Sequence, residues 1–416
     1  MNNVSIAALI RGFCIDLTGK PQFVVHETFK EGNIPVSAMI IELNPAESDK
    51  NAAGIIRSSY EIWKKSADKF KISDNQGKPG ESENTRLIPA CAALKIDGKY
   101  QALYWIGNDL DAARKKLKER DASPGREQAS RVWKTVRTEE RASVVKNKIA
   151  LVTGGAQGIG EEIVRNLTSA GAVVFIADLN IDGAEKLAQE INAAEERTAA
   201  LAVCVNVSDE SSVKNMFDAV AMTAGGLDLC VSNAGVLKAG SVLEQELSDF
   251  RFVTDINYTG FFVISKYAGR LLQTQHFAAL NWKTDIIQIN SKSGLEGSNK
   301  NGAYAGGKFG GIGLVASFAM ELIEYNIKVN AICPGNFLDG PLWSHPEKGL
   351  FVQYLKTGKV PGAKSIEDVR TFYEAKVPMK RGCTGKDLVR ALYYIIEQEY
   401  ETGQALPVTG GQIMLH

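Results

Sequence analysis

The stretch IALVTGGAQGIGE, residues 149–161, decides the fold of the larger part of this chain. Its first four residues are apolar and suit a buried β-strand, which leads directly into a turn with glycines at positions 154, 158 and 160. These glycines allow a tight turn, close approach of a phosphate to the backbone, and a helix whose free N–H groups and positive dipole end favour an anion. The stretch therefore predicts a strand, a phosphate-binding turn and a helix, with a plain glycine-rich turn as the alternative.

An acidic residue follows at the end of the next apolar run. Residues 173–176 predict a second strand, and Asp178 stands 18 residues after Gly160. A carboxylate at this place hydrogen-bonds a ribose 2′-hydroxyl and repels a 2′-phosphate, and the turn carries Gln157 rather than an arginine or lysine. The sequence therefore favours NAD over NADP, although Asp178 could instead cap a turn.

Short apolar runs alternate with helix-length segments along the rest of the chain. The further runs are residues 200–205, 227–231, 286–289, 329–333 and 405–408. Strands that are buried on both faces and joined by helices are typical of a doubly wound parallel sheet. We therefore predict an α/β fold of the Rossmann type over residues 146–416, preceded by a smaller α+β domain.

Four polar residues downstream of the glycine turn form a candidate catalytic set. Tyr304 and Lys308 stand four residues apart, on one face of a helix, and a nearby lysine lowers the pKa of a phenol so that it can exchange a proton with an alcohol. Ser291 follows the strand at 286–289, from where its hydroxyl can hold a substrate oxygen. Asn257 can anchor a water that links Lys308 to solvent. Each residue alone is common, but their order after a nucleotide turn indicates hydride transfer between a secondary alcohol and a nicotinamide cofactor.

Residues 146–416 resemble the short-chain dehydrogenase/reductase family. The resemblance rests on the glycine turn, on Asn233-Ala234-Gly235, on the catalytic set with 13 residues from Ser291 to Tyr304, and on Pro334-Gly335. It implies an NAD-dependent oxidoreductase, usually a homodimer or homotetramer, in which Lys308 also holds the nicotinamide ribose. The cofactor contacts that it implies are Gly154, Gln157, Gly158, Ile159, Gly160, Asp178, Asn206, Val207, Asn233, Ala234, Gly235, Tyr304, Lys308, Pro334 and Gly335.

Within this family the sequence is similar to the subfamily of sorbitol-6-phosphate dehydrogenases. Stretches 289–294, 308–311, 335–338, 377–383 and 402–412 carry this similarity. It implies the oxidation of sorbitol 6-phosphate to fructose 6-phosphate. Besides Ser291, we expect Lys238 and Lys292 to bind substrate, because an ammonium group can face a phosphate, although either could be a solvated loop lysine. Residues 337–378 are expected to form a substrate lid.

The sequence also departs from the family pattern. Ser232 replaces the usual first asparagine before Asn233, and Asn206 stands where an aspartate commonly meets the adenine. The stretch 276–285, which contains Trp282, is longer than usual. A dehydrogenase of an unphosphorylated polyol, sugar or hydroxy-ketone therefore stays open as an alternative, as does an NAD-sensing regulator without turnover.

In the first third of the chain we recognise no catalytic, cofactor-binding or metal-binding motif. Residues 1–120 predict an accessory α+β domain, with a helix over 52–70, a polar loop over 73–84 and a β-hairpin that pairs 87–96 with 100–106 and turns at Asp97-Gly98. Asn108 or Asp109 is expected to cap a short helix that runs to position 120. Residues 121–145 predict a charged helical linker, and a role in assembly or regulation is the favoured hypothesis for this part.

The amino-acid composition disfavours several classes of protein. The 416 residues carry 48 basic and 48 acidic side chains, which disfavours a general nucleic-acid binder because such proteins need a basic excess. The six cysteines are scattered and the four histidines have no metal-ligand spacing, so we expect free thiols, a reducing compartment and no metal site. Neither a secretory leader nor a membrane span is recognisable, and a cytoplasmic enzyme acting on a small molecule is expected.

Overall fold

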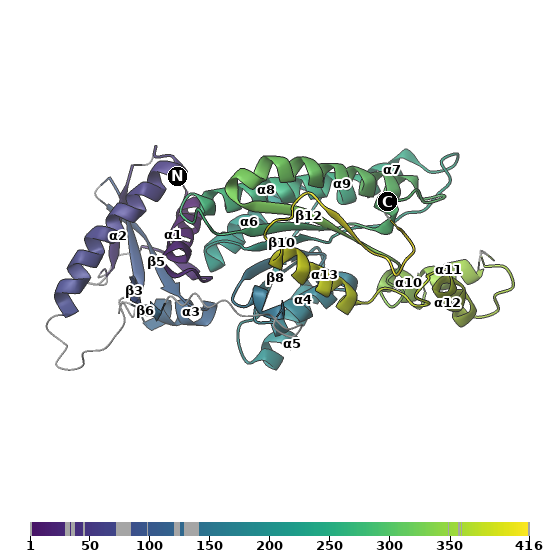
Figure 1. The fold of residues 1–416 in the computed structure, drawn as a ribbon, viewed down its shortest axis with the longest axis horizontal. Coiled ribbons are helices and arrows are strands. Elements are labelled where there is room, and N and C mark those ends of the chain that lie inside the picture. Colours follow the sequence, from purple (N-terminus) through teal and green to yellow (C-terminus); the bar gives the residue numbers. More distant parts are fainter. Residues whose placement is uncertain are drawn as a thin grey trace.

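The computed structural model describes residues 2–29, 34, 38–44, 46–71, 85–97, 99–119, 125–128 and 141–414, other than 348, 357 and 359. The predicted loop at 73–84 and residues 121–124 and 129–140 of the predicted linker lie outside these ranges. We call residues 2–128 the small domain and residues 141–414 the large domain. Figure 1 shows the small domain at one end of the molecule and the helices α10, α11 and α12 of the large domain at the other.

The large domain is built on a sheet of seven strands in the order β13-β12-β11-β10-β7-β8-β9. All neighbouring strands in it are parallel. The strands are β7 (Ile149–Thr153), β8 (Val173–Asp178), β9 (Ala200–Cys204), β10 (Leu229–Ser232), β11 (Thr284–Ile289), β12 (Ile327–Pro334) and β13 (Ala405–Val408). The prediction of a doubly wound parallel sheet is confirmed, and every predicted run forms a strand. The strand order reverses between β7 and β10, and in open parallel sheets ligands bind at the carboxyl ends of the strands at such a point.

Helices cover both faces of this sheet (Figure 1). One face holds α4 (Gly158–Ser169), α5 (Ile181–Glu195) and α13 (Gly385–Glu397), and the other holds α6 (Glu210–Ala224), α8 (Gly260–His276) and α9 (Gly302–Leu322). Because successive strand residues point to opposite faces, Leu151 packs into the core on the α8 side and Val152 into the core on the α4 side. Burial on both faces explains why these strands read as continuous apolar runs.

The segment between β12 and α13 forms a small helical unit with a core of its own. It contains α10 (Pro341–Ser344), α11 (Leu350–Lys356) and α12 (Ile366–Ala375). Trp343 is buried at its centre, with ring centroids 5.2 Å from Phe351 and 4.8 Å from Tyr373. We call residues 337–378 the lid segment.

The small domain has a four-stranded sheet in the order β1-β5-β4-β2. Its elements are α1 (Asn3–Thr18), β1 (Phe23–Thr28), β2 (Met39–Leu43), α2 (Asp49–Lys71), β4 (Cys91–Ile96), β5 (Lys99–Gly107) and α3 (Leu110–Glu119). The predicted helix over 52–70 and the hairpin between β4 and β5 are confirmed. Asp109 caps α3 as expected, because its Oδ1 accepts from the Ala112 N–H at 2.7 Å.

Two local predictions in the small domain are wrong. Residues 87 and 88 belong not to the hairpin but to β3 (Thr85–Ile88), which is separated from β4 by Pro89 and Ala90. Residues 125–128 of the predicted helical linker form strand β6 (Gly125–Gln128), which pairs with β3 in antiparallel fashion. Here pairing with a distant strand overrides the local helical preference of a charged stretch. The linker ends in a short 3-10 helix, η1 (Arg141–Val145).

The small domain is joined to the large domain by a buried ion pair. Arg11 of α1 and Asp228, which precedes β10, are both fully buried and lie 2.6 Å apart. The Arg11 guanidinium also donates to the Gln22 carbonyl and to Gln275 Oε1, each at 2.7 Å. Asp228 in turn accepts from the N–H of Ile149, the first residue of β7. The contact therefore reaches the beginnings of the strands that lead to the glycine turn.

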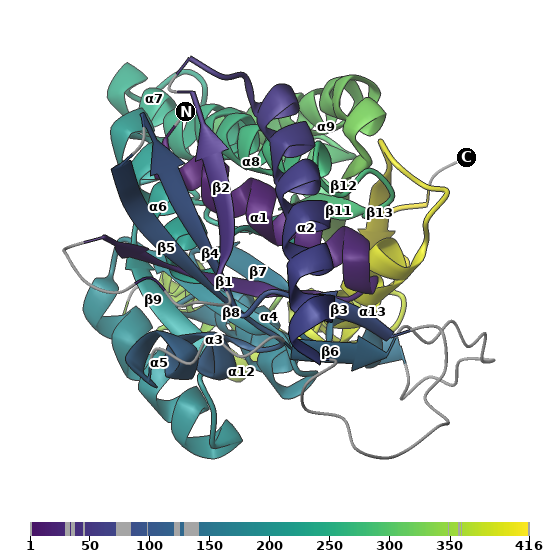
Figure 2. The same ribbon diagram turned by 90° about the vertical axis from the view of Figure 1, so that its left-hand side faces the viewer.

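The long stretch at 276–285 serves this domain contact. Phe277 and Ala278 pack into the hydrophobic core of the small domain, and the Trp282 indole donates to Asp228 Oδ1 at 2.9 Å. Helix α1 approaches α8 so closely that a Cβ on Gly12 would lie 2.4 Å from the Gln275 carbonyl oxygen. Figure 2 shows α1 behind the small-domain sheet, facing the large domain.

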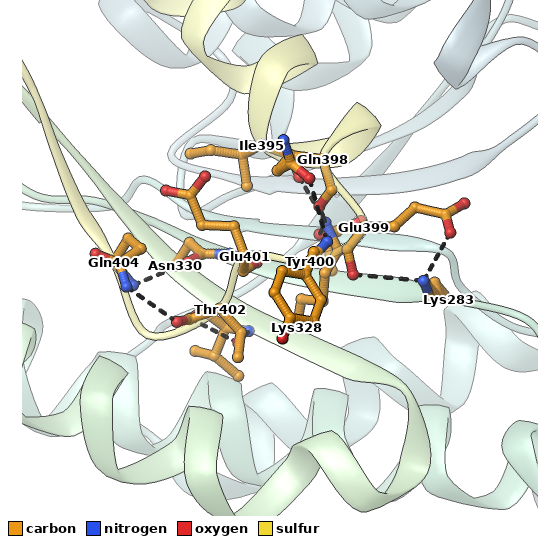
Figure 3. A network of polar contacts seen from close by, with 12 residues as sticks. Lys283, Lys328, Asn330, Ile395, Gln398, Glu399, Tyr400, Glu401, Thr402 and Gln404 are labelled. Carbon is orange, nitrogen blue, oxygen red and sulfur yellow. Dashed lines mark hydrogen bonds and ion pairs between the residues drawn. The ribbon is translucent and has the colours of Figure 1, made fainter.

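Further polar contacts, one buried and one exposed, hold the segment that leads to the carboxyl-terminal strand (Figure 3). Lys328 of β12 is buried and lies 2.9 Å from Asp285, and its ammonium donates to the carbonyls of Ile395 and Gln398 at the end of α13. Next to it, Lys283 pairs with Glu399 at 2.7 Å. These contacts fix the loop between α13 and β13 at the same edge of the sheet as the small domain.

Candidate active site

The glycine turn has the backbone geometry that the sequence predicted. Gly154 and Gly158 have positive φ angles of 61° and 58°, which strain any residue with a side chain. A Cβ on Gly160 would lie 2.0 Å from the Gly154 carbonyl oxygen, so the turn closes only with glycine there. Helix α4 begins at Gly158 and directs its free N–H groups into the turn. These features fit the pyrophosphate of a dinucleotide.

The end of β10 locks this turn in place. Thr153 Oγ1 accepts from the N–H groups of Asn233 and Ala234, each at 3.0 Å. The Asn233 side chain donates to the carbonyls of Thr153 and Gly154 at 2.9 and 3.0 Å. Asn233 therefore shapes the cofactor site through the turn. Sequence reasoning missed Thr153, although its place as a polar residue at a strand end is a usable signal.

Asp178 lies at the carboxyl end of β8, beside the glycine turn. Its Oδ2 accepts from the Ala156 N–H at 3.0 Å, and its Oδ1 accepts from the Asn180 N–H at 3.0 Å. The Asp178 carboxylate therefore caps the turn, which was the alternative to ribose binding. It also lies at the strand end where a carboxylate that binds the cofactor ribose is expected. After the next strand, β9, Asn206 accepts from Ser208 through its side-chain oxygen.

Tyr304 and Lys308 lie on the first turns of α9, opposite Ser291. The Lys308 ammonium is 5.6 Å from the centre of the Tyr304 ring and donates to the Ile289 carbonyl at 2.9 Å. Ser291 immediately precedes the short 3-10 helix η3 (Lys292–Gly294), and its hydroxyl hydrogen-bonds the phenol of Tyr304. The structure therefore brings together the three residues that proton exchange with an alcohol requires.

The pKa of Tyr304 differs from the sequence-based expectation. Burial raises the pKa of the phenol above its usual 10, and the hydrogen bond with Ser291 offsets only part of this effect. Burial also lowers the pKa of Lys308 to about 8. The expected lowering of the Tyr304 pKa by Lys308 is not seen, because desolvation dominates at both groups.

Asn257 and Asn290 tie the surrounding loops together. Asn257 lies in a π-helical turn, η2 (Asp255–Thr259), and its side chain both donates to the carbonyl and accepts from the N–H of Val236, each at 2.8 Å. Asn290 is buried, donates to the Lys308 carbonyl at 2.9 Å and accepts from the Ser291 N–H at 2.8 Å. Asn290 thus links the two catalytic elements, and sequence reasoning missed it.

Further predicted cofactor residues lie at the same carboxyl ends of the strands. Gly335 follows β12 and donates to the Val408 carbonyl at 2.9 Å. Val207 is buried against Gly260 at the start of α8. The lid segment reaches this edge too, since a Cβ on Gly158 would lie 3.2 Å from Pro341 at the start of α10.

The two lysines predicted to face a phosphate differ in their surroundings. Lys238 is exposed, and its ammonium forms an ion pair with Asp249. Lys292 is half-buried beside Ser291. Of the two, Lys292 has no ion pair or hydrogen bond with another described residue, whereas Lys238 is paired. Within the described ranges, no cluster of three or more histidine, cysteine or acidic residues is arranged to hold a metal ion.

One helix, Gly302–Tyr325, is long and apolar enough to cross a membrane by length and composition. It consists of α9 and its extension, packs on β12 and η3, and carries Tyr304 and Lys308. Of its apolar window, 28% is buried.

Comparison with known proteins bears on the family of the large domain. A model of the short chain dehydrogenase family matches residues 148–345. Sorbitol-6-phosphate 2-dehydrogenase of Escherichia coli (strain K12) is 36% identical over 271 residues, which are 64% of this chain and 99% of that protein. A 3-oxoacyl-[acyl-carrier-protein] reductase of Aquifex aeolicus (strain VF5) is 28% identical over 269 residues, which are 64% of this chain and 98% of that protein.

A solved structure is also similar to this chain in sequence and fold. The crystal structure of sorbitol-6-phosphate 2-dehydrogenase from Erwinia amylovora is 38% identical and superposes with a TM-score of 0.59, covering 64% of this chain and 100% of that one. Enzymes of this kind generally use NAD or NADP, act on small molecules and commonly form oligomers. The shared geometry at the strand ends and the nearly full-length relative lead to one conclusion, that this chain belongs to the short-chain dehydrogenase family of oxidoreductases.

Proposed function

We propose that the protein oxidises sorbitol 6-phosphate to fructose 6-phosphate, and catalyses the reverse reduction, with NAD as its cofactor. The observation that carries the chemistry is the joint placement of Ser291, Tyr304 and Lys308 beside a turn built for a pyrophosphate. The relative from Escherichia coli, at 36% identity, supports the substrate. Asp178 beside the turn supports NAD over NADP, because a carboxylate there disfavours a 2′-phosphate.

Each residue has a distinct part in the proposed reaction. When bound, NAD supplies the hydride acceptor for the carbon that bears the alcohol. Ser291 holds the substrate oxygen, and Tyr304 takes the hydroxyl proton in oxidation and returns it in reduction. Lys308 holds the cofactor ribose and steadies the charge that develops on Tyr304. Asn257 positions the loop at Val236 and anchors the water that relays the proton.

The surroundings of the site complete the proposal. The lid segment covers the substrate, and the glycine turn with Asp178, Asn206, Asn233 and Gly335 holds the cofactor. We propose a cytoplasmic homodimer or homotetramer, as is common in the family. A dehydrogenase of an unphosphorylated polyol or hydroxy-ketone is the second candidate, since the 3-oxoacyl reductase relative covers the same share of the chain with another named substrate.

A spectrophotometric screen tests the proposal. NAD and NADP reduction are followed with sorbitol 6-phosphate, sorbitol and other hexitols on the full chain. We expect NAD reduction with sorbitol 6-phosphate to have the highest kcat/KM. A preference for an unphosphorylated alcohol would establish the second candidate.

The Tyr304→Phe variant tests the proton transfer. Removing the phenol hydroxyl should lower kcat by about 100- to 10,000-fold, since general acid–base catalysis contributes on this order. NADH binding, measured by fluorescence titration, should stay close to that of the parent chain. A variant with full turnover would overturn the role of Tyr304.

A further inference from the structure

A buried amide lies between the two elements that carry the catalytic residues. Asn290 directly precedes Ser291 and is 3% exposed. Its Oδ1 accepts from the Ser291 N–H at 2.8 Å, and its Nδ2 donates to the Lys308 carbonyl at 2.9 Å and to Gln288 Oε1 at 2.8 Å. Exchanging the amide oxygen and nitrogen would face each of these groups with a like partner, so the orientation of the amide is fixed.

Gln288 holds this amide from the neighbouring position on the strand. Because side chains alternate along a strand, Gln288 and Asn290 point to the same face, which is the face that α9 covers. Helix α9 comes so close that a Cβ on Gly311 would lie 2.5 Å from Gln288 Nε2. On the other side, a Cβ on Gly294 would lie 2.2 Å from Asn290 Oδ1. The two amides are therefore enclosed between β11, η3 and α9.

Lys308 is bound to the serine strand at two points. Its carbonyl accepts from Asn290, and its ammonium donates to the Ile289 carbonyl at 2.9 Å. Tyr304 lies one helical turn earlier on α9, so it moves together with Lys308. A displacement of α9 along β11 would carry both groups away from Ser291, and a misplacement of about 1 Å can cost about 100-fold in rate.

We propose that Gln288 and Asn290 are positioning residues that hold Ser291 in register with Tyr304 and Lys308. Gln288 orients the Asn290 amide, and the amide joins the backbone of Ser291 to that of Lys308. Both residues act through these backbones and not on the substrate. The inference rests on the proposed proton transfer, but it does not depend on which alcohol is the substrate.

Asn330 of β12 provides a matched control. Like Asn290, it is a buried asparagine of the same sheet, 1% exposed, with both polar atoms of its side chain hydrogen-bonded. Its Nδ2 donates to the Glu401 carbonyl at 3.3 Å and its Oδ1 accepts from the Gln404 N–H at 2.9 Å (Figure 3). These bonds lead to the loop before β13, so the loss of this side chain tests the general effect of removing a buried amide.

The kinetic test compares Gln288→Met, Asn290→Ala and Asn330→Ala on the full chain, each shown by urea denaturation to be folded under the assay conditions. We expect kcat to fall by about tenfold or more in the first two variants and to stay within about twofold of the parent in Asn330→Ala. Methionine fills the space of glutamine without its acceptor, so Gln288→Met provides the test alone if Asn290→Ala does not fold. A kcat retained in Gln288→Met, or lost equally in Asn330→Ala, would overturn the inference.

Combination with Tyr304→Phe distinguishes positioning from general damage. If the pair acts by placing the phenol, its loss should cost little once the phenol hydroxyl is gone, so kcat of Tyr304→Phe/Gln288→Met should lie within about threefold of that of Tyr304→Phe. Losses that multiply in the double variant would overturn the inference. Full turnover in Tyr304→Phe would refute the proposed proton transfer and this inference with it, whereas a loss in Tyr304→Phe without one in Gln288→Met would refute this inference alone.

Discussion

Tyr304 and Lys308 stand one helical turn apart, and burial acts on them in opposite directions. The phenol pKa is raised above 10, so Tyr304 keeps its proton at neutral pH and is ready to donate it to a ketone. The pKa of Lys308 falls to about 8, so its charge is present below that pH and is lost above it. The two shifts make separate contributions to the dependence of the reaction on pH.

We therefore predict that kcat/KM for ketone reduction falls about tenfold per pH unit above the Lys308 pKa of about 8. Tyr304 and a substrate phosphate, whose second pKa is about 6, do not titrate in this range. Initial rates between pH 6.5 and about 10 check this prediction. In Lys308→Arg the fall should move above pH 10, because the guanidinium keeps its charge. A parent profile that is flat through pH 9 would contradict the assignment.

Sequence reasoning named residues whose chemistry is local and missed those whose role arises from tertiary contacts. Ser291, Tyr304 and Lys308 could be found because their spacing matches a known pattern. Asn290 could not, since its significance lies in a hydrogen bond to the Lys308 carbonyl 18 residues away in sequence. The pairing of Lys238 with Asp249 was equally invisible, and it removes one expected phosphate contact.

Among the elements, the glycine turn depends most strictly on single residues. A Cβ on Gly160 would lie 2.0 Å from the Gly154 carbonyl oxygen, so the Gly160→Ala chain must open the turn or displace α4. We predict that Gly160→Ala weakens NADH binding at least tenfold, as measured by fluorescence titration. Gly313→Ala is the matched control, because a Cβ at this exposed position in α9 meets nothing within 4 Å. It should bind NADH normally and raise stability by about 0.4–1 kcal/mol. Unchanged NADH binding in Gly160→Ala would contradict the geometry.

Elements were predictable where local pattern and tertiary environment agree. Strands β7, β8, β10, β11 and β12 are buried along almost their whole length, which explains the continuous apolar runs from which they were predicted. Strand β6 carries the sequence GREQ and becomes a strand only through β3, more than 35 residues earlier in the chain. No periodicity within residues 125–128 could reveal that partner.

At the scale of the whole molecule, the small domain and the active site lie at opposite edges of the same sheet (Figure 1). Arg11 reaches Asp228 at the beginning of β10, whereas Asn233 and the glycine turn lie beyond its end. Within the described ranges, the small-domain contacts given above involve none of Ser291, Tyr304 and Lys308. The buried contacts of the small domain anchor the strands that present the site, so we expect this domain to act on stability rather than on the chemical step.

The buried ion pair makes this expectation testable. Arg11→Met leaves the Asp228 carboxylate buried with two hydrogen bonds, from Ile149 and Trp282, but without its guanidinium. Breaking one side of a buried pair costs about 3–5 kcal/mol in the free energy of unfolding, which urea denaturation measures. Adding Asp228→Asn should restore part of this loss because the uncompensated charge disappears. The exposed pair of Lys214 and Asp218 provides the control, and Lys214→Ala should cost no more than about 1 kcal/mol.

The dependence of this loss on pH identifies its cause. Burial raises the pKa of Asp228, but Arg11 and Lys148 outweigh burial and hold it below its usual value, so the pair stabilises the chain above that value and stops doing so as pH falls. Without Arg11 the carboxyl pKa should rise, and the neutral acid is far less costly to bury. We therefore expect the stability difference between Arg11→Met and the parent chain to shrink as pH falls from 7 toward about 4. A difference that is constant over this range would mean that lost packing of the arginine side chain, and not an unpaired carboxylate, causes the destabilisation.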